Sequence, residues 1–189
     1  MYAGGSIEAG GSNDSLILRD GKSTIHVGAF PPDLNDLKKY YTAVLDLTGS
    51  PLTKAERGKR MAFAGASQGT LLYLNTTIGD HPQAPIEQLL GGERDVLSWL
   101  QDAWDSGRKI LVHCKEGVSR APTVAAAFLI KHHLRSGGLL LAEEMAGGVP
   151  LHTAALRFVR RGRWLINPNE GFLAKLEEFA LAHSVIVVD

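Results

Sequence analysis

The chain has 189 residues, which is enough for one well-buried domain and short for two. Hydrophobic residues make up 44% and charged residues 21%, and the 20 basic residues balance the 20 acidic ones. A neutral chain of this composition gives no support to a nucleic-acid-binding or membrane-surface protein. It also holds no apolar run of membrane-spanning length and no secretory signal at its start, so we expect no membrane insertion.

The first third of the chain predicts a disordered segment followed by a hairpin, a short helix and a strand. Residues 1–14 are rich in Gly and Ser and offer little to bury, so we expect them to be disordered. Hydrophobic residues then alternate on both sides of Asp20 and Gly21, which is a strong hairpin signal. Asp33 is predicted to cap a short helix, and the apolar stretch 42–47 is typical of a buried strand.

A long polar connection, residues 48–70, comes next and carries a cluster of basic side chains: Lys54, Arg57, Lys59 and Arg60. Two interpretations stay open, a solvated insertion or a basic wall that receives an acidic part of a substrate. The strand predicted at 70–76 leads to Asp80, which begins a loop that contains prolines. Asp80 is either a functional carboxylate or an ordinary turn or helix-cap residue.

The stretch from Lys109 to Lys131 predicts a strand, a glycine-containing loop and a helix that follow one another directly. Pro122 stands in the first turn of this helix, where a missing N–H group costs nothing. Such a loop forms a phosphate cradle, because successive backbone N–H groups converge and the helix dipole adds positive potential. Cys114, the only cysteine of the chain, is expected to be a thiolate here beside Arg120. The alternative is a small buried hydrophobic residue.

Helices are also predicted at 93–106 and 151–161, and a last helix is expected to end near residue 182. Residues 135–150 lie between two glycine pairs and predict a short amphipathic helix, to which we assign no role. Basic residues gather after it, and we interpret them as a solvated face with a substrate clamp as the alternative: Arg157, Arg160, Arg161 and Arg163.

The string HCKEGVSR resembles the HCxxGxSR signature of the dual-specificity branch of the cysteine phosphatases. Tyr73, Ile78 and Asp80 match the strand and the general acid of that family, and INPNEGFLAKL resembles its closing segment. The resemblance covers nearly the whole chain. It implies a catalytic domain at 15–182, with 183–189 as a tail. The implied fold class is α/β, a single domain whose central mixed, largely parallel sheet is flanked by helices.

The resemblance also implies a role for each matching residue. Cys114 is the expected nucleophile, Asp80 the general acid and then base, and Ser119 the residue that assists departure of the thiolate. His113 and Asn169 are expected to support the loop. The phosphate is expected to bind to the Arg120 side chain and to the loop backbone: Lys115, Glu116, Gly117, Val118, Ser119 and Arg120.

The implied activity is metal-independent hydrolysis of phosphotyrosine and phosphoserine or phosphothreonine esters in proteins, without a cofactor. Lys115 also resembles the lysine of phosphoinositide phosphatases, but Glu116 adds a negative charge that disfavours a polyanionic headgroup. Phosphoinositide or other non-protein phosphatases therefore stay as alternatives, as does a catalytically weak phosphate-binding module. The single cysteine fits a reducing compartment, so we expect the cytoplasm and leave the nucleus open. The sequence does not indicate an oligomeric state.

Overall fold

The computed structural model describes residues 14–29, 37, 39–49, 71–93 and 95–184. Several expectations therefore lie outside the described residues: the disorder of residues 1–13, the helix cap at Asp33 with most of its helix, the basic part of the connection 48–70, and the end of the tail.

A five-stranded mixed sheet forms the centre of the fold, in the order β1-β2-β5-β3-β4. The strands are β1 (Asp14–Asp20), β2 (Ser23–Gly28), β3 (Ala43–Asp46), β4 (Leu72–Asn75) and β5 (Lys109–His113). β1 pairs antiparallel with β2, and each of the other neighbouring pairs is parallel. The predicted mixed, largely parallel sheet is confirmed.

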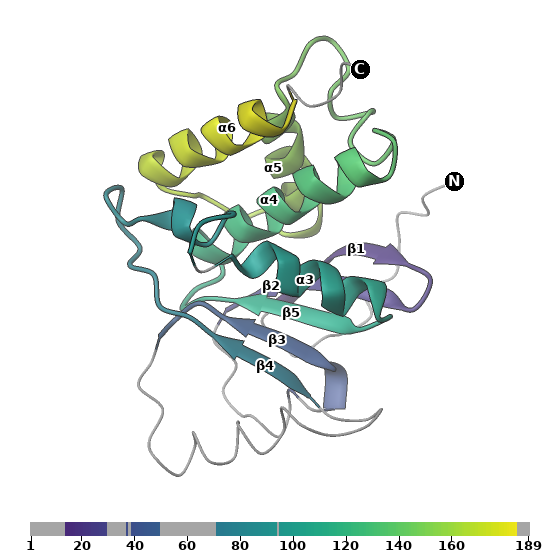
Figure 1. Ribbon diagram of the computed structural model, residues 1–189, viewed down its shortest axis with the longest axis vertical. Helices are drawn as coiled ribbons and strands as arrows, with labels where there is room; N and C mark the ends of the chain where they lie inside the picture. Colours follow the sequence, from purple (N-terminus) through teal and green to yellow (C-terminus); the bar gives the residue numbers. More distant parts are fainter. Residues whose placement is uncertain (1–13, 30–36, 38, 50–70, 94, 185–189) are drawn as a thin grey trace.

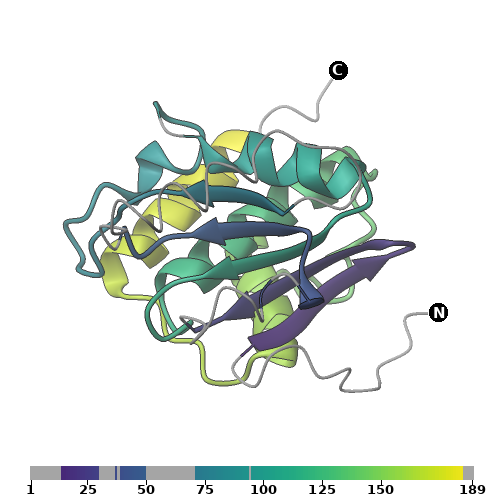
Figure 2. The same cartoon turned by 90° about the horizontal axis from the view of Figure 1, so that it is seen from below.

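Four α-helices pack together on one face of this sheet (Figures 1 and 2). They are α3 (Val96–Asp105), α4 (Arg120–Arg135), α5 (Leu151–Gly162) and α6 (Glu170–Ser184), and a short 3-10 helix, η1 (Ile86–Gln88), precedes them. α4 is buried from Arg120 to Ile130, because its small alanines let the other three helices pack closely around it. The sequence predicts helices flanking the sheet; those that the structure describes in full share one face.

The opposite face of the sheet carries a smaller apolar cluster, made by Leu37, Tyr41, Val44, Leu71 and Leu111. Side chains alternate between the two faces along each central strand, as the period of two requires. In β5, Ile110 and Val112 belong to the main core, whereas Leu111 belongs to the smaller cluster. Both faces are thus covered, which explains why the central strands are continuously apolar.

Two local predictions need correction. The hairpin turn is Gly21-Lys22, one residue later than predicted, because Asp20 pairs with Ser23 in the ladder. Residues 136–148 form a series of turns instead of a short helix, since Gly137, Gly138, Gly147 and Gly148 all have positive φ angles. Leu141 anchors these turns: it is fully buried, and its N–H group donates to His133 Nδ1 on α4 at 3.0 Å.

Among the described helices, none combines the length and the apolar character that crossing a membrane requires.

Candidate active site

The carboxyl ends of β3 and β5 meet at one edge of the sheet, and the predicted catalytic residues lie around this edge. β5 ends at His113, so Cys114 is the first residue beyond the strand. The N–H group of Leu47, the first residue beyond β3, donates to the carbonyl of His113 at 2.9 Å. Open α/β sheets bind their ligands at this position, because the loops that follow adjacent parallel strands converge there.

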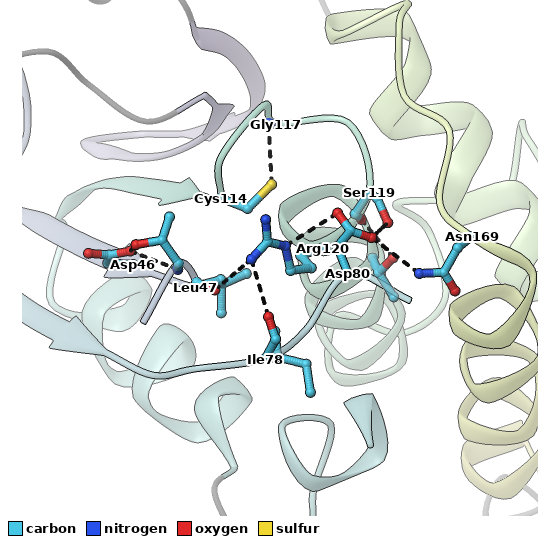
Figure 3. Close-up of polar contacts among 11 residues, drawn as sticks. Asp46, Leu47, Ile78, Asp80, Cys114, Gly117, Ser119, Arg120 and Asn169 are labelled. Carbon is cyan, nitrogen blue, oxygen red and sulfur yellow. Dashed lines mark hydrogen bonds and ion pairs between the residues drawn. The ribbon is translucent and has the colours of Figure 1, made fainter. Parts of the chain in front are cut away.

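The phosphate loop, Cys114–Arg120, folds back over the cysteine. The N–H group of Gly117 donates to Cys114 Sγ at 3.2 Å (Figure 3). Gly117 has φ +68°, and a Cβ atom at this position would lie 2.5 Å from the Gly28 carbonyl oxygen. Both the backbone angle and the close approach to the end of β2 therefore require glycine.

The sulfur of Cys114 lies in front of the N-terminus of α4. The residue is 1% exposed, and α4 begins at Arg120, so the positive end of the helix dipole faces the loop. The Gly117 N–H group adds a direct hydrogen bond to the sulfur. The helix N-terminus and this hydrogen bond are the two features of the site that favour a nucleophilic cysteine.

Arg120 extends from the first turn of α4 into the site. Its Nη1 donates to the carbonyl oxygens of Leu47 and Ile78, at 3.3 and 3.2 Å. These two residues lie just beyond β3 and in the segment that follows β4, so the guanidinium connects both segments to the phosphate loop. The side chain is held in one place before any phosphate arrives.

Asp80 lies directly beside this guanidinium (Figure 3), with its Oδ2 3.3 Å from Arg120 Nε. Its other oxygen, Oδ1, accepts hydrogen bonds from Ser119 Oγ at 2.6 Å and Asn169 Nδ2 at 3.2 Å. The structure therefore brings Asp80 together with Cys114 and Arg120 of the phosphate loop, from two separate parts of the chain.

The structure gives Ser119 and His113 contacts that the sequence did not predict. The hydroxyl of Ser119, expected to face the sulfur, donates to Asp80 instead. The ring of His113 is fully buried, and its Nε2 lies 3.9 Å from Asp46 Oδ1. Both contacts depend on segments that lie far away in the sequence, so local reasoning about the loop could not supply them.

Asn169 connects the segment that precedes α6 to Asp80. Besides donating to Asp80, it accepts the N–H group of Phe172 through Oδ1 at 3.0 Å, in the first turn of α6. Asn167, in the same segment, is exposed, and its backbone N–H donates to the Val118 carbonyl at 2.8 Å. Of the remaining loop residues, Lys115 and Glu116 are exposed and Val118 is partly buried.

Sequence reasoning missed Asp46, a completely buried carboxylate at the end of β3. It accepts hydrogen bonds from Thr48, Tyr73 and Asn75. Burial by itself would raise the pKa of Asp46, but the adjacent His113 and these hydrogen bonds hold that pKa below its ordinary value. The carboxylate stays ionised and holds the ends of β3 and β4 together next to the residue that precedes Cys114.

Arg163 is the second residue that the sequence did not reveal. We expected it on a solvated basic face, but it is 7% exposed and its guanidinium donates to the backbone of the phosphate loop. The sequence holds no signal for this contact, because Arg163 stands among three other arginines on or beside α5.

In the part of the chain that the structure describes, no group of three or more His, Cys, Asp or Glu side chains is placed to hold a metal ion. The site is instead made of a thiol, a guanidinium, a carboxylate and backbone N–H groups, which suits phosphoryl transfer to sulfur.

Comparison with known proteins agrees with this geometry. Residues 42–181 match the family described as "Dual specificity phosphatase, catalytic domain". The chain belongs to this family. Dual specificity protein phosphatase 15 of Rattus norvegicus is 29% identical over 114 residues, which are 60% of this chain and 41% of that protein. Dual specificity protein phosphatase 1 of Mus musculus is 28% identical over 112 residues, or 59% of this chain and 26% of that protein. The chain thus spans less than half the length of these dual specificity phosphatases.

Solved structures of dual specificity phosphatases and related proteins have the same fold. The alignment with a crystal structure of DUSP15 spans 85% of this chain and 85% of the DUSP15 chain, with a TM-score of 0.58 and 23% identity. The alignment with human DUSP28 spans 89% of this chain and 95% of the DUSP28 chain, with a TM-score of 0.60 and 20% identity. Tk-PTP in its active form gives a TM-score of 0.60 at 24% identity, over 88% of this chain and 97% of its own.

Proposed function

We propose that this chain hydrolyses phosphate esters of tyrosine and of serine or threonine in proteins, through a cysteinyl-phosphate intermediate. The observation that carries the proposal is the meeting of Cys114, Arg120 and Asp80 at one edge of the sheet, around a loop whose Gly117 N–H group already points at the sulfur. Membership in the dual specificity phosphatase family supports it.

The first step of the proposed reaction transfers the phosphoryl group to sulfur. The substrate phosphate binds to the loop N–H groups and to the Arg120 fork, where it competes with Asp80 for the guanidinium. The Cys114 thiolate attacks phosphorus, an S–P bond forms, and the P–O bond to the leaving group breaks. Protonated Asp80 gives its proton to the leaving oxygen. The N–H groups and Arg120 stabilise the charge that spreads over the equatorial oxygens.

The second step returns the enzyme to its starting state. Asp80, now a carboxylate, takes a proton from a water molecule while the water oxygen attacks phosphorus. The S–P bond breaks, and the Cys114 thiolate and inorganic phosphate are released. Ser119 and Asn169 are placed to hold the Asp80 carboxylate for this step, since both donate to its Oδ1.

The charges beside the phosphate loop favour a protein substrate over a phosphoinositide. Lys115 and Glu116 are adjacent and both exposed, so the positive charge that would attract a second phosphate is offset by a negative one. Val118, the other variable position of the loop, carries no charge. A phosphoinositide phosphatase remains the second candidate because of Lys115 alone.

A panel of substrates tests the proposal. Purified protein is assayed for phosphate release from phosphotyrosyl and phosphothreonyl peptides, phosphoinositides and triphosphorylated RNA, with Cys114→Ser as the matched control. We expect turnover of both peptides by the wild type and none by the variant. Preference for the lipid or the RNA would replace the proposed substrate class. Oxyanion binding without any turnover would show a phosphate-binding module.

We also propose a reducing compartment such as the cytoplasm, with the nucleus left open, as the place where this chain works. A buried catalytic thiolate without a second cysteine in the chain depends on surroundings that keep it reduced. Fractionation of cells that express the tagged protein tests this, and a secreted protein would contradict it.

A further inference from the structure

Three successive carbonyl groups of the phosphate loop accept hydrogen bonds from one neighbouring segment, Arg163–Asn167. Arg163 Nε donates to the Gly117 oxygen at 2.7 Å and its Nη2 to the Glu116 oxygen at 3.0 Å. The backbone N–H of Asn167 donates to the Val118 oxygen at 2.8 Å. The segment thus holds the loop on the side of its carbonyl groups.

Holding these carbonyls decides where the loop N–H groups point. In a trans peptide unit the C=O of one residue and the N–H of the next point in opposite directions. When the carbonyl of Glu116 is held by Arg163, the N–H of Gly117 must face the other way, and it donates to Cys114 Sγ. By the same geometry, fixing the carbonyls of Gly117 and Val118 turns the next two N–H groups away from the Arg163–Asn167 segment.

The position of Arg163 depends on the contact between α5 and β1. Arg163 follows the last residue of α5, Gly162, where a Cβ atom would lie only 2.4 Å from the Leu16 carbonyl oxygen of β1. The absence of a side chain lets the end of the helix lie against the strand, which places the guanidinium between β1 and the loop. Burial lowers the pKa of Arg163, while the negative charges of Cys114 and Asp14 oppose that effect.

We propose that Arg163 is a positioning residue that turns the N–H groups of the phosphate loop toward the bound phosphate. Its two hydrogen bonds go to backbone oxygens of the loop, so it acts through the loop rather than on the substrate. The inference rests on the proposed function and extends it to a residue outside the signature.

Arg163→Lys tests the geometric part of this role, because an ammonium keeps the charge and loses the planar fork that reaches two carbonyls at once. The matched control is Arg157→Lys, the same change at an exposed position of α5. Tungstate affinity is measured by calorimetry in a Cys114→Ser background, and kcat and KM for an aryl phosphate are measured with Cys114 intact. We expect Arg163→Lys to weaken tungstate binding by about tenfold or more and to lower kcat/KM by about 10²-fold, as a misplaced site does. The control should change neither.

Unchanged tungstate affinity and kcat/KM in Arg163→Lys would overturn the inference, and so would a lower melting temperature with normal affinity, which indicates a structural role alone. If Arg163→Lys does not fold, Arg163→Gln is judged by the same two measurements. A wild type that binds tungstate but turns over no phosphate ester would contradict the proposed function, while the binding comparison would still decide the role of Arg163.

Discussion

Asp14→Asn is expected to make the protein more stable to heat at pH 8 and to change its stability little at pH 4. The Asp14 side chain lies at the start of β1 and is 7% exposed. Its Oδ1 lies 4.0 Å from Nδ1 of His26 on β2. Arg163, at the end of α5, is the charged group that acts on it most. Burial raises the pKa of Asp14 to about 6, and the opposing charge of Arg163 only partly offsets this. The folded protein therefore binds this proton more tightly than the unfolded chain does.

The sign and the size of the effect follow from that shift. Because the folded pKa lies above the unfolded value of 3.8, the free energy of unfolding falls as the pH rises from about 4 to about 6 and stays at the lower level above. A shift of about two units corresponds to at most about 3 kcal/mol. Solvent screening at this edge strand reduces it to about 1–2 kcal/mol. For a domain of this size, this is a change in melting temperature of about 3–6 °C.

The assay is thermal unfolding of wild type and Asp14→Asn at half-unit steps from pH 4 to pH 8. Asp20→Asn, at the exposed other end of β1, is the matched control and should show no such trend. A second pair in a His26→Gln background removes the titration of the neighbouring ring. An Asp14→Asn variant that is less stable than wild type by the same amount at every pH would refute the reasoning, because a neutral side chain would then be no better at this position than a carboxylate.

Three further predictions concern the catalytic residues. Asp80→Asn should lower kcat for a phenyl phosphate by about 10²-fold, and the loss should shrink for nitrophenyl phosphate, whose leaving group needs no proton; an equal loss for both would place the acid elsewhere, with His81 tested first. Arg120→Lys should nearly abolish kcat/KM, because an ammonium cannot bind two phosphate oxygens as the fork does; wild-type kinetics would contradict the assigned role. Dilute peroxide at pH 7 should inactivate the enzyme with only partial rescue by thiols, since Cys114 has no partner cysteine in the chain; mass spectrometry should then detect a species one water lighter than the sulfenic acid, and resistance to peroxide would argue against a thiolate.

Those parts of the protein whose structure depends on neighbours along the chain could be predicted from the residues alone. The strand, loop and helix from Lys109 to Arg135 could be predicted from local features. These are the apolar run of the strand, Gly117 in the loop and Pro122 in the first turn of the helix. Asp80, in the segment that follows β4, could be found because it matches the general-acid position of the family. The mixed sheet was expected from the resemblance to the dual-specificity phosphatases, a family to which the chain belongs.

The distant side chains that complete the site could not be predicted, because the packing of whole elements places them. In the sequence, Arg163 looks like one of several surface arginines. Its burial beside the phosphate loop depends on how closely α5 approaches β1. In the sequence, Asp46 is only the polar residue near the end of a predicted strand. The side chains that contact it come from β4 and β5. The hydroxyl of Ser119 donates to Asp80 because the segment that follows β4 lies beside it. Each of these contacts depends on the packing of whole elements against one another, which no local pattern of residues records.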